Sequence, residues 1–283
     1  MCDTCGCNVT PAADEHAVEV LKGLLDANDH QAGHNREHFA RHDALAVNLM
    51  SSPGAGKTSL LEATIDALRD ELSVAVIEGD LETENDASRI RRHGVEAIQI
   101  TTGSACHLDA HMVHDALHNL KLDGLDIVFV ENVGNLACPA SFDLGQHVNV
   151  ALLSVPEGDD KPAKYPVMFR AADLVLVTKS DLLEVLGDFD PDAAERCVRA
   201  IEARGFILAS SMAYALGVGL VAGAQRVHRR LHAAEGGHHH HRQGAVHGLQ
   251  AGEELETLAP RGGVPTVVEV GQHHVEVAPL RRR

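Results

Sequence analysis

A glycine-rich turn between an apolar run and a helix-like stretch constrains the fold more than any other feature of the sequence. Residues Ala44 to Met50 form the apolar run, and residues Thr58 to Leu72 have the composition of a helix. Between them, residues Ser51 to Thr58 read SSPGAGKT. Glycines in such a turn let backbone N–H groups point inward around a phosphate, and the following helix presents its positive end. The segment therefore predicts a strand, a phosphate-binding P-loop and a helix in direct succession.

Two side chains of the predicted loop would act directly on a bound nucleotide. Lys57 would reach the β- and γ-phosphates, and the hydroxyl of Thr58 would coordinate Mg²⁺. A glycine-rich turn that binds nothing is the alternative, but a strand before the turn and a helix after it favour nucleotide binding. The residues predicted to contact the nucleotide here are Gly54, Ala55, Gly56, Lys57, Thr58 and Ser59.

Further apolar runs recur along the chain, and helix-like stretches separate several of them. These runs are Val74 to Glu78, Val95 to Ile100, Ile127 to Val130, Val148 to Leu153 and Leu174 to Val177. Near-continuous apolar strands that alternate with helices indicate a parallel sheet covered on both faces. We therefore predict an α/β P-loop NTPase domain with a mostly parallel sheet and helices on both faces.

Composition divides the chain into four segments. Residues 1–14 are rich in cysteine, and residues 15–42 have the periodicity of a leading amphipathic helix. Residues 43–232 make up the predicted P-loop domain. Residues 233–283 contain histidines, glycines and charges without clear periodicity, so we expect a flexible tail, in which a short strand pair near Thr266 to Val270 and His274 to Val277 is left open.

The overall charge bears on the classes of partner. The chain has 24 Lys and Arg against 41 Asp and Glu, a formal net charge of -17. Nucleic-acid binding depends on cations that neutralise phosphates, so we expect no nucleic-acid partner. No apolar run is long enough for a membrane span, and the N-terminus lacks the order of a signal peptide. We therefore expect a cytoplasmic protein without a membrane partner.

Acidic residues at two strand ends fit the same nucleotide site. Asp80 follows one apolar run and could hold Mg²⁺ directly or through water, as strand-end acidic residues do in P-loop NTPases. Glu131 ends another run and could hold Mg²⁺ or orient water. Acidic residues also occupy ordinary turns, which is the alternative for both. Lys57, Asp80 and Glu131 are the predicted catalytic residues.

The segment Thr178-Lys179-Ser180-Asp181 discriminates between bases. It resembles the N/T-K-x-D signature of GTPases and ends another apolar run. The carboxylate of Asp181 can accept hydrogen bonds from the N1 and N2 donors of guanine, and adenine lacks that pair of donors. The stem of Lys179 can cover the face of the base. The sequence therefore favours GTP over ATP.

Cysteine and histidine side chains follow two of the predicted strands. Cys106 and His107 come after the Val95 to Ile100 run, and Cys138 comes after the Ile127 to Val130 run. The carboxyl ends of parallel strands meet at one edge of a sheet, which here also carries the P-loop. Two thiolates and an imidazole suit Zn²⁺ or Ni²⁺. Buried cysteines without a metal are the alternative.

A second thiol group lies at the N-terminus. Cys2, Cys5 and Cys7, with the α-amino nitrogen, could provide four ligands for a borderline divalent ion; square-planar Ni²⁺ fits such a set, and Zn²⁺ would also bind. An unstructured redox tag is the alternative. The histidines His238 to His241 could hold metal weakly, and the sequence leaves the origin of that tract open.

Taken together, these segments resemble the hydrogenase nickel-incorporation GTPases, the HypB family. The similarity covers about residues 1 to 205 and rests on MCDTCGC, NLMSSPGAGKTSLLE, GDLETENDASRI, GSACHLDAHMV and ENVGNLACPASFDLG. The resemblance implies that Cys2, Cys5 and Cys7 bind nickel tightly. It implies that Cys106, His107 and Cys138 form a second nickel or zinc site at a nucleotide-dependent dimer interface.

The resemblance also implies a function and partners. The implied function is slow GTP hydrolysis to GDP and phosphate with Mg²⁺, together with delivery of Ni²⁺ to a [NiFe]-hydrogenase large-subunit precursor. The implied partners are a second copy of the chain in a GTP-dependent homodimer and a HypA-like accessory protein. The family's SAKTGEG-like guanine loop is replaced here by a stretch that contains Ser210-Ser211. Two alternatives stay open: a GTPase metallochaperone for another nickel enzyme such as urease, and a metal-storage module with a vestigial P-loop.

Overall fold

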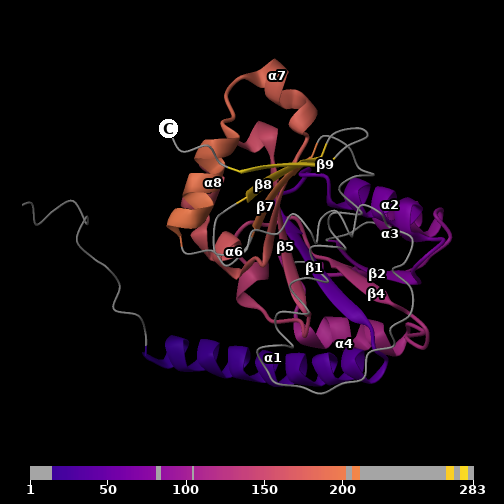
Figure 1. Ribbon diagram of the computed structural model, residues 1–283. Coiled ribbons are helices and arrows are strands. Elements are labelled where there is room, and N and C mark those ends of the chain that lie inside the picture. The colour runs from indigo at the N-terminus through magenta and orange to yellow at the C-terminus, as the bar shows by residue number, and fades with distance from the viewer. Residues whose placement is uncertain are drawn as a thin grey trace, which may run out of the picture.

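A single twisted sheet forms the centre of the protein, with helices on both of its faces (Figure 1). The computed structural model describes residues 15–80, 84–103, 105–201, 206–210, 266–270 and 275–279. The predicted α/β class with a mostly parallel sheet is confirmed. The predicted nickel ligands Cys2, Cys5 and Cys7 and the tract His238 to His241 lie outside the described residues.

The secondary structure follows the predicted alternation of strands and helices. The strands are β1 (Leu45–Ser51), β2 (Val74–Asp80), β3 (Glu96–Thr101), β4 (Ile127–Glu131), β5 (Val148–Ser154), β6 (Leu174–Thr178), β7 (Phe206–Ser210), β8 (Thr266–Val270) and β9 (Val275–Pro279). The α-helices are α1 (Glu15–Arg41), α2 (Lys57–Leu68), α3 (Asn85–Arg91), α4 (Ala110–His118), α5 (Lys161–Lys164), α6 (Pro166–Ala171), α7 (Leu183–Leu186) and α8 (Pro191–Ala200). Short 3₁₀ turns are η1 (Pro139–Ser141), η2 (Val155–Glu157) and η3 (Ser180–Leu182).

The strand order places the P-loop strand in the middle of the sheet. The order is β3-β2-β4-β1-β5-β6-β7-β8-β9. All neighbours pair in parallel except β8 and β9, which are antiparallel. The chain leaves β1 toward β2 on one side and later runs from β5 to β6 on the other. In open α/β sheets, ligands bind outside the carboxyl ends of the strands at such a reversal point.

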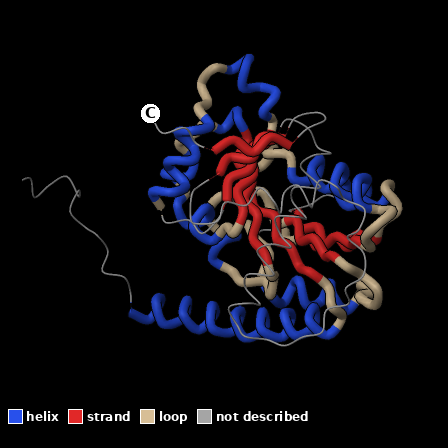
Figure 2. Tube along the Cα trace, viewed as in Figure 1, coloured by secondary structure: helices blue, strands red, loops and turns tan. Residues whose placement is uncertain are grey.

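Helices cover both faces of the sheet (Figure 2), and the side chains that alternate along β1, β2, β4, β5 and β6 enter core clusters on opposite faces. Leu49, Phe129 and Leu176 belong to the core cluster that also contains residues of α2 and α3. The opposite face is covered by α1 and α4 near β2 and β4, and by α6 and α8 near β5 and β6. Because side chains alternate along a strand, residues two positions further on return to the same face.

This alternation aims several strand-end residues at the P-loop helix. Ser51, Glu131 and Thr178 each lie two residues beyond a side chain that is buried in the α2 cluster. Their polar side chains therefore project from the carboxyl edge on the α2 side, and all three are buried. The sheet register thus gathers the polar groups around the start of α2.

The leading helix α1 packs against α4 along one side of the molecule (Figure 1). The backbone N–H of Ala110 donates to Asn28 Oδ1 at 2.9 Å. Asn35 Nδ2 donates to the carbonyl oxygens of Ala110 and Leu144, at 2.8 and 3.0 Å. The two buried asparagine side chains thus pair with backbone groups that would otherwise lack hydrogen-bond partners. These contacts hold α1 against the rest of the domain.

Part of the predicted C-terminal tail belongs to the sheet. The strand pair left open by the sequence is present as β8 and β9, and β8 extends the parallel sheet beyond β7. The rest of residues 233–283 lies outside the described residues. Within the described part of the chain, no helix has the length and apolar character needed to cross a membrane.

Candidate nucleotide and metal site

The P-loop has the backbone conformation that its glycines allow. Gly54 and Gly56 have φ angles of 74° and 100°, in the left-handed region that disfavours side chains. Gly56 directly precedes α2, which begins at Lys57. The turn therefore presents the amino end of α2 at the carboxyl edge of the sheet, the arrangement in which backbone N–H groups and the helix dipole bind phosphate.

The two functional side chains of the loop are buried and hydrogen-bonded. Lys57 Nζ donates to Ser51 Oγ at 3.0 Å, and Lys57 is only 7% exposed. Thr58 Oγ1 donates to Glu131 Oε1 at 3.0 Å. The structure therefore brings together the predicted phosphate-binding lysine, the predicted Mg²⁺-binding threonine and one of the predicted strand-end acids. Ser59 lies one residue further on and is exposed.

The predicted base-recognition segment contacts the P-loop directly. Thr178 Oγ1 donates to the carbonyl oxygen of Ala55 at 2.8 Å, and Lys179 Nζ donates to that of Gly54 at 2.8 Å. Lys179 has a φ of 58°, which turns the chain sharply after β6. Asp181 follows in η3 and is exposed to solvent. Its carboxylate is thus accessible beside the loop, as recognition of a base edge requires.

Glu78 is a buried acid that the sequence analysis did not select. It lies in β2, pairs in register with Glu131 of β4, and is 1% exposed. A signal was available, because Glu78 is the one charge within the run VAVIEG and lies two residues before Asp80, on the same face of the strand. The sequence analysis read it as the end of an apolar run.

The two neighbouring carboxyl groups are electrostatically unusual. Burial is the main cause that raises the pKa of Glu78, and the adjacent Glu131 raises it further. Burial also raises the pKa of Glu131, whereas Lys57 and Thr58 act in the opposite direction. Among the described residues, both carboxyl oxygens of Glu78 and Oε2 of Glu131 are buried without a hydrogen-bond partner. Buried acidic oxygens beside a threonine hydroxyl suit a hard divalent cation such as Mg²⁺.

Asp80 lies at the edge of the same group. It is the last residue of β2, and its backbone carbonyl accepts a hydrogen bond from the N–H of Thr102 at 2.9 Å. It is partly exposed and shares a strand face with Glu78. Residues 81–83, which follow it, lie outside the described residues. Its assignment to Mg²⁺ stays a prediction.

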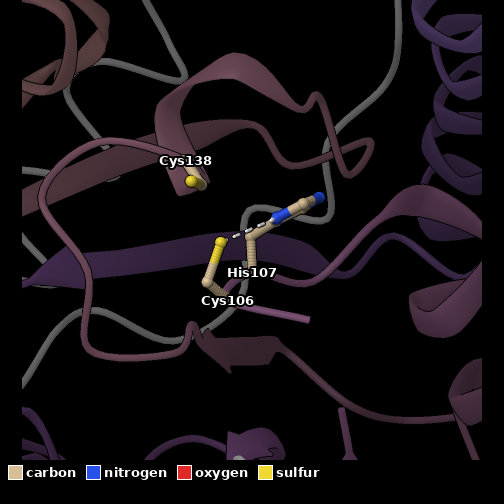
Figure 3. Close-up of side chains that lie close together, drawn as sticks. All are labelled: Cys106, His107 and Cys138. Carbon is tan, nitrogen blue, oxygen red and sulfur yellow. Dashed lines mark hydrogen bonds between the residues drawn. The ribbon is translucent and has the colours of Figure 1, made fainter. Parts of the chain in front are cut away.

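Two cysteines and a histidine lie together in the loops beyond β3 and β4 (Figure 3). Their candidate ligand atoms all lie within 4.8 Å of one another, and each residue is partly buried. Cys106 Sγ is 3.7 Å from His107 Nδ1, and the thiol of Cys138 faces this pair from the other loop. Three soft or borderline ligands with partial exposure leave room for a further ligand, which suits an exchangeable metal.

Asn135 connects the two loops that carry these ligands. Its side chain donates to the backbone carbonyl of Cys106 at 3.4 Å and accepts hydrogen bonds from the N–H groups of Ala137 and Cys138, at 2.8 and 3.4 Å. Asn135 could not be selected from the sequence, because an asparagine in a loop carries no distinctive signal. It acts on the thiol cluster by holding the loop backbones together.

Local contacts set the protonation of the cluster. The neighbouring thiol of Cys106 is the main cause that raises the pKa of Cys138. Burial lowers the pKa of His107, whose ring stacks on Phe142 with 3.9 Å between ring centroids. The imidazole is therefore neutral at pH 7, the form that can coordinate metal, and a metal ion would displace the thiol protons.

The loop that leads to Cys138 also touches the P-loop. A Cβ atom added at Gly134 would lie 2.9 Å from Pro53 Cα, so only glycine allows this approach of the two backbones. Gly134 lies three residues after Glu131 and four before Cys138. The nucleotide residues and the thiol cluster are thus joined by a short segment in direct contact with the phosphate-binding turn.

Comparison with known proteins identifies the family. The CobW/HypB/UreG nucleotide-binding domain matches residues 45–206. The chain is 54% identical over 185 residues to hydrogenase maturation factor HypB of Rhizobium leguminosarum bv. viciae, covering 65% of this chain and 62% of that protein. It is 51% identical over 196 residues to the same factor of Escherichia coli K12, covering 69% and 67%. The chain thus spans about three fifths to two thirds of the length of these relatives.

Solved structures agree with the sequence relatives. HypB from Helicobacter pylori in complex with nickel superposes with a TM-score of 0.66 at 41% identity, covering 71% of this chain and 96% of that one. HypB from Archaeoglobus fulgidus superposes with a TM-score of 0.62 at 36% identity, covering 74% and 99%. With the P-loop, the thiol cluster and these matches in agreement, the chain belongs to the CobW/HypB/UreG nucleotide-binding domain family and, within it, to the HypB hydrogenase maturation factors.

Proposed function

We propose that this protein is a slow GTPase that binds Ni²⁺ and delivers it during [NiFe]-hydrogenase maturation. The observation that carries the proposal is the direct contact between the P-loop and the loop of Cys138, with Gly134 against Pro53. A nucleotide site and an exchangeable metal site share this one connection. Membership of a family with a nickel-bound solved structure supports nickel as the cargo.

Residues of the P-loop would bind the triphosphate and stabilise its transfer. The N–H groups before α2 would hold the phosphate oxygens. Lys57 would move from Ser51 Oγ to the β- and γ-phosphates, where its ammonium group would balance charge that develops in the transition state. Its buried position favours this role, because a fixed charge in a water-poor site stabilises the transition state more strongly than an exposed one.

Three acidic residues beside the P-loop would position Mg²⁺ and the attacking water: Glu131, Glu78 and Asp80. Mg²⁺, held by Thr58 and Asp80, would neutralise charge on the phosphates. Glu131 would orient the attacking water, since one of its oxygens already accepts a hydrogen bond from Thr58 and the other has no partner among the described residues. Glu78, with its raised pKa, would hold a proton beside Glu131 and so limit the repulsion between two buried carboxylates.

The exposed carboxylate of Asp181 would select guanine. It would accept hydrogen bonds from the N1 and N2 positions, while Lys179 and Thr178 hold the segment against the P-loop carbonyls. An adenine base would leave the carboxylate without donors, at a cost of about 1–3 kcal/mol. The protein would therefore hydrolyse GTP in preference to ATP.

Nickel would bind at two places with different roles. Cys2, Cys5 and Cys7 would hold one Ni²⁺ tightly, and Cys106, His107 and Cys138 would hold Ni²⁺ or Zn²⁺ in an exchangeable site. Loops next to a γ-phosphate reorder when the phosphate leaves. The Gly134 segment would transmit that change to Cys138, so hydrolysis would alter the geometry of the second metal site and release its ion.

A GTP-dependent homodimer would complete this exchange. Three ligands per chain leave coordination positions open, and a two-fold partner could present a second set alongside. A HypA-like accessory protein and the hydrogenase large-subunit precursor would be the cytoplasmic partners that exchange the nickel.

A matrix of metal and nucleotide binding tests the proposal. The protein with Cys2, Cys5 and Cys7 replaced by Ala is titrated with Ni²⁺ and with Zn²⁺ in the presence of GDP or a non-hydrolysable GTP analogue, and its mass is followed by sedimentation. We expect metal affinities that differ between the two nucleotides and a larger mass with the GTP analogue. By linkage, each metal must shift nucleotide affinity by the same factor.

A matched control separates the cluster from other thiols. Cys197 is a partly buried thiol on α8, outside the cluster, so Cys197→Ser should leave the matrix unchanged. Cys106→Ser should remove the difference between nucleotides. Equal metal affinities and equal masses with both nucleotides would refute the coupled function and leave a metal-storage protein with an unused P-loop.

One relative favours a second target enzyme. The chain is 46% identical over 181 residues to a hydrogenase/urease maturation factor HypB of Helicobacter hepaticus. Nickel delivery to a urease would use the same two sites and differ only in the acceptor. Transfer of ⁶³Ni from the loaded protein to a hydrogenase large-subunit precursor, but not to an apo-urease, would separate the two acceptors.

A further inference from the structure

A group of imidazoles lies where α1 packs against α4, away from the thiol cluster. His114 and His118 are one turn apart on α4, and their Nε2 atoms approach to 3.0 Å. His38 of α1 lies beside them, with 6.0 Å between its ring centroid and that of His118. His42 directly follows the last residue of α1, with its ring centroid 5.3 Å from that of His38. None of these residues takes part in the proposed nucleotide or thiol sites.

The hydrogen bonds of His114 determine which ring nitrogen carries its proton. Asn35 Nδ2 donates to two backbone carbonyls, so the orientation of this buried amide is fixed with Oδ1 as the acceptor. His114 Nδ1 lies 3.0 Å from that oxygen and must therefore donate to it. In the neutral ring, Nε2 is then unprotonated and directs its lone pair at His118. A histidine oriented by a carbonyl in this way has the arrangement found for metal ligands.

The spacing of the pair fits coordination to one ion. Bonds of about 2.0–2.1 Å from nitrogen to a divalent transition metal place two cis ligand atoms roughly 3.0–3.4 Å apart. The observed separation of 3.0 Å lies at the short end of that range. The two rings have centroids 4.5 Å apart and are nearly perpendicular, so both nitrogens can face a common point. Without an ion, the two Nε2 atoms can share a single hydrogen bond.

His38 supplies a third nitrogen from the other helix. Two imidazoles on one ion have ring centres about 5 Å apart. The 6.0 Å between His38 and His118 is therefore close to the required separation, and both side chains are at least partly exposed and can rotate. His42 is held differently, because its Nδ1 lies 2.9 Å from Asp123 Oδ1. His42 is thus a neighbour that is already paired, whereas His38 faces α4.

The electrostatics of the group favour neutral rings. Burial is the main cause that lowers the pKa of both His38 and His114, and neighbouring histidines lower it further. Clustered imidazoles resist protonation because each added proton repels the next. At neutral pH the lowered pKa of His38 and of His114 favours their uncharged nitrogens, which bind borderline cations such as Ni²⁺, Zn²⁺ and Cu²⁺.

We propose that His38, His114 and His118 form a surface site for one divalent transition-metal ion, which bridges α1 and α4. The site differs from the thiol cluster in its ligand type, since it has imidazole nitrogens alone. It would hold the same class of ion as the thiol cluster, because imidazole nitrogens and thiolates both suit borderline divalent cations. The inference depends on the α1–α4 contact and stands independently of the nucleotide chemistry.

Histidine modification with Ni²⁺ as the probe tests the site in the full chain. Diethyl pyrocarbonate modifies neutral imidazole nitrogens, and peptide mass spectrometry reports the extent at each histidine. We expect Ni²⁺ to protect His114 and His118 at concentrations that leave His93 reactive. His93 is a suitable internal standard, because it is a partly exposed histidine that pairs with Asp66 and lies outside the group.

Two variants locate the ligands. His38→Gln should raise the Ni²⁺ concentration that half-protects His118 by about 10- to 100-fold, the range seen when metal sites lose supporting residues. The matched control is His30→Gln with His34→Gln, a second pair one turn apart on α1 whose ring centroids are 4.7 Å apart. This control should leave the protection of His118 unchanged. Circular dichroism of each variant confirms that α1 and α4 remain folded.

Equilibrium dialysis independently measures the number of Ni²⁺ ions bound per chain. The parent should bind one more equivalent of Ni²⁺ than the protein with both His114→Gln and His118→Gln. Protection of His118 that equals protection of His93, or an unchanged number of equivalents in the double variant, would overturn the proposal. Protection that survives His38→Gln without a shift would also overturn it, because the ion would then bind α4 alone.

Discussion

At the carboxyl edge of the sheet, the P-loop residues are held more firmly than the residues of the thiol cluster. On the phosphate side, Lys57, Thr58 and Glu131 are buried, and each is held by a hydrogen bond from or to a neighbouring element. On the thiol side, Cys106 and Cys138 are partly exposed, and their loops are joined through the side chains of Asn132 and Asn135. Both halves follow parallel strands of the same sheet.

This difference matches what each half would have to do. A group that stabilises a transition state works best when it is fixed before the reaction, because it then needs no reorganisation. A site that accepts and releases an ion needs open coordination positions and movable ligands. We therefore expect substitutions on the phosphate side to lower the rate of GTP hydrolysis strongly. Substitutions on the thiol side should instead change the coupling between nucleotide binding and metal binding.

Lys57→Ala should have the largest effect. It removes the buried cation aimed at the phosphates, and loss of one preorganised group of this kind typically lowers kcat by about 10²–10³-fold. GTP hydrolysis by the purified variant measures this, and Ni²⁺ affinity without nucleotide should stay at the parent value. Lys164→Ala is the matched control, since Lys164 is exposed and pairs with Asp160. A variant at Lys57 with the parent rate would contradict the P-loop assignment.

Glu78→Gln should change the dependence of stability on pH. The pKa of Glu78 is raised in the folded protein, so the folded state binds more protons than the unfolded state once the pH exceeds the unfolded value near 4.5. Parental stability therefore falls as pH rises above about 4.5, and glutamine removes this loss. Between pH 5 and 8 the variant should gain about 4 kcal/mol relative to the parent, since the folded pKa lies above this range and each pH unit then corresponds to about 1.4 kcal/mol.

Urea unfolding at pH 5, 6.5 and 8 without nucleotide or Mg²⁺ measures this gain. Glu96→Gln is the control, because Glu96 is an exposed glutamate on the neighbouring strand β3. Parallel pH curves for the parent and Glu78→Gln would show that the buried acid pair is not protonated in the folded state.

Asp181→Asn should move base preference from GTP toward XTP. The substituted amide would direct an NH₂ group at a guanine donor, whereas the oxygen at position 2 of xanthine can accept from it. Loss of one hydrogen bond to the charged carboxylate costs about 1.5–3 kcal/mol, so GTP affinity should fall by about 10- to 100-fold. Competition binding with GTP and XTP measures the preference, with the exposed Asp188→Asn as control. Unchanged GTP affinity would remove Asp181 from the base site.

Gly134→Ala should have the smallest effect, and it tests the link between the halves directly. The added Cβ would lie 2.9 Å from Pro53 Cα, so the two loops must separate. We expect the nucleotide-dependent shift in Ni²⁺ affinity to weaken by about fivefold, the lower end of typical coupling. Gly23→Ala on the exposed part of α1 is the control, since nothing lies within 4 Å of its added Cβ. A full-sized shift in Gly134→Ala would place the coupling elsewhere.

Much of the fold could be predicted from the sequence, because apolar runs and glycine turns act locally. The runs of β1, β2 and β4 were located to within two residues, since a strand buried on both faces needs continuous apolar residues. The sheet order could not be read in the same way. It depends on which strands pair across long separations, such as β1 between β4 and β5, and no local pattern records that choice.

The candidate site was predictable where residue type implies chemistry. Lys57, Thr58 and Glu131 were selected, and the structure brings them together. Glu78 was missed because its function depends on burial beside another acid, a property of the sheet register rather than of the segment. The roles of Cys2, Cys5 and Cys7 stay predictions, since they lie outside the described residues.

The hydrogen bonds that join Thr178 and Lys179 to the P-loop span 123 and 125 residues of sequence. During synthesis the P-loop leaves the ribosome long before β6. Its carbonyl groups therefore lack these two hydrogen-bond donors until β6 has been made. A nascent chain that ends before β6 would hold the phosphate-binding motif without the side chains that brace it. Domains fold largely as units, so nucleotide could stabilise only a nearly complete chain.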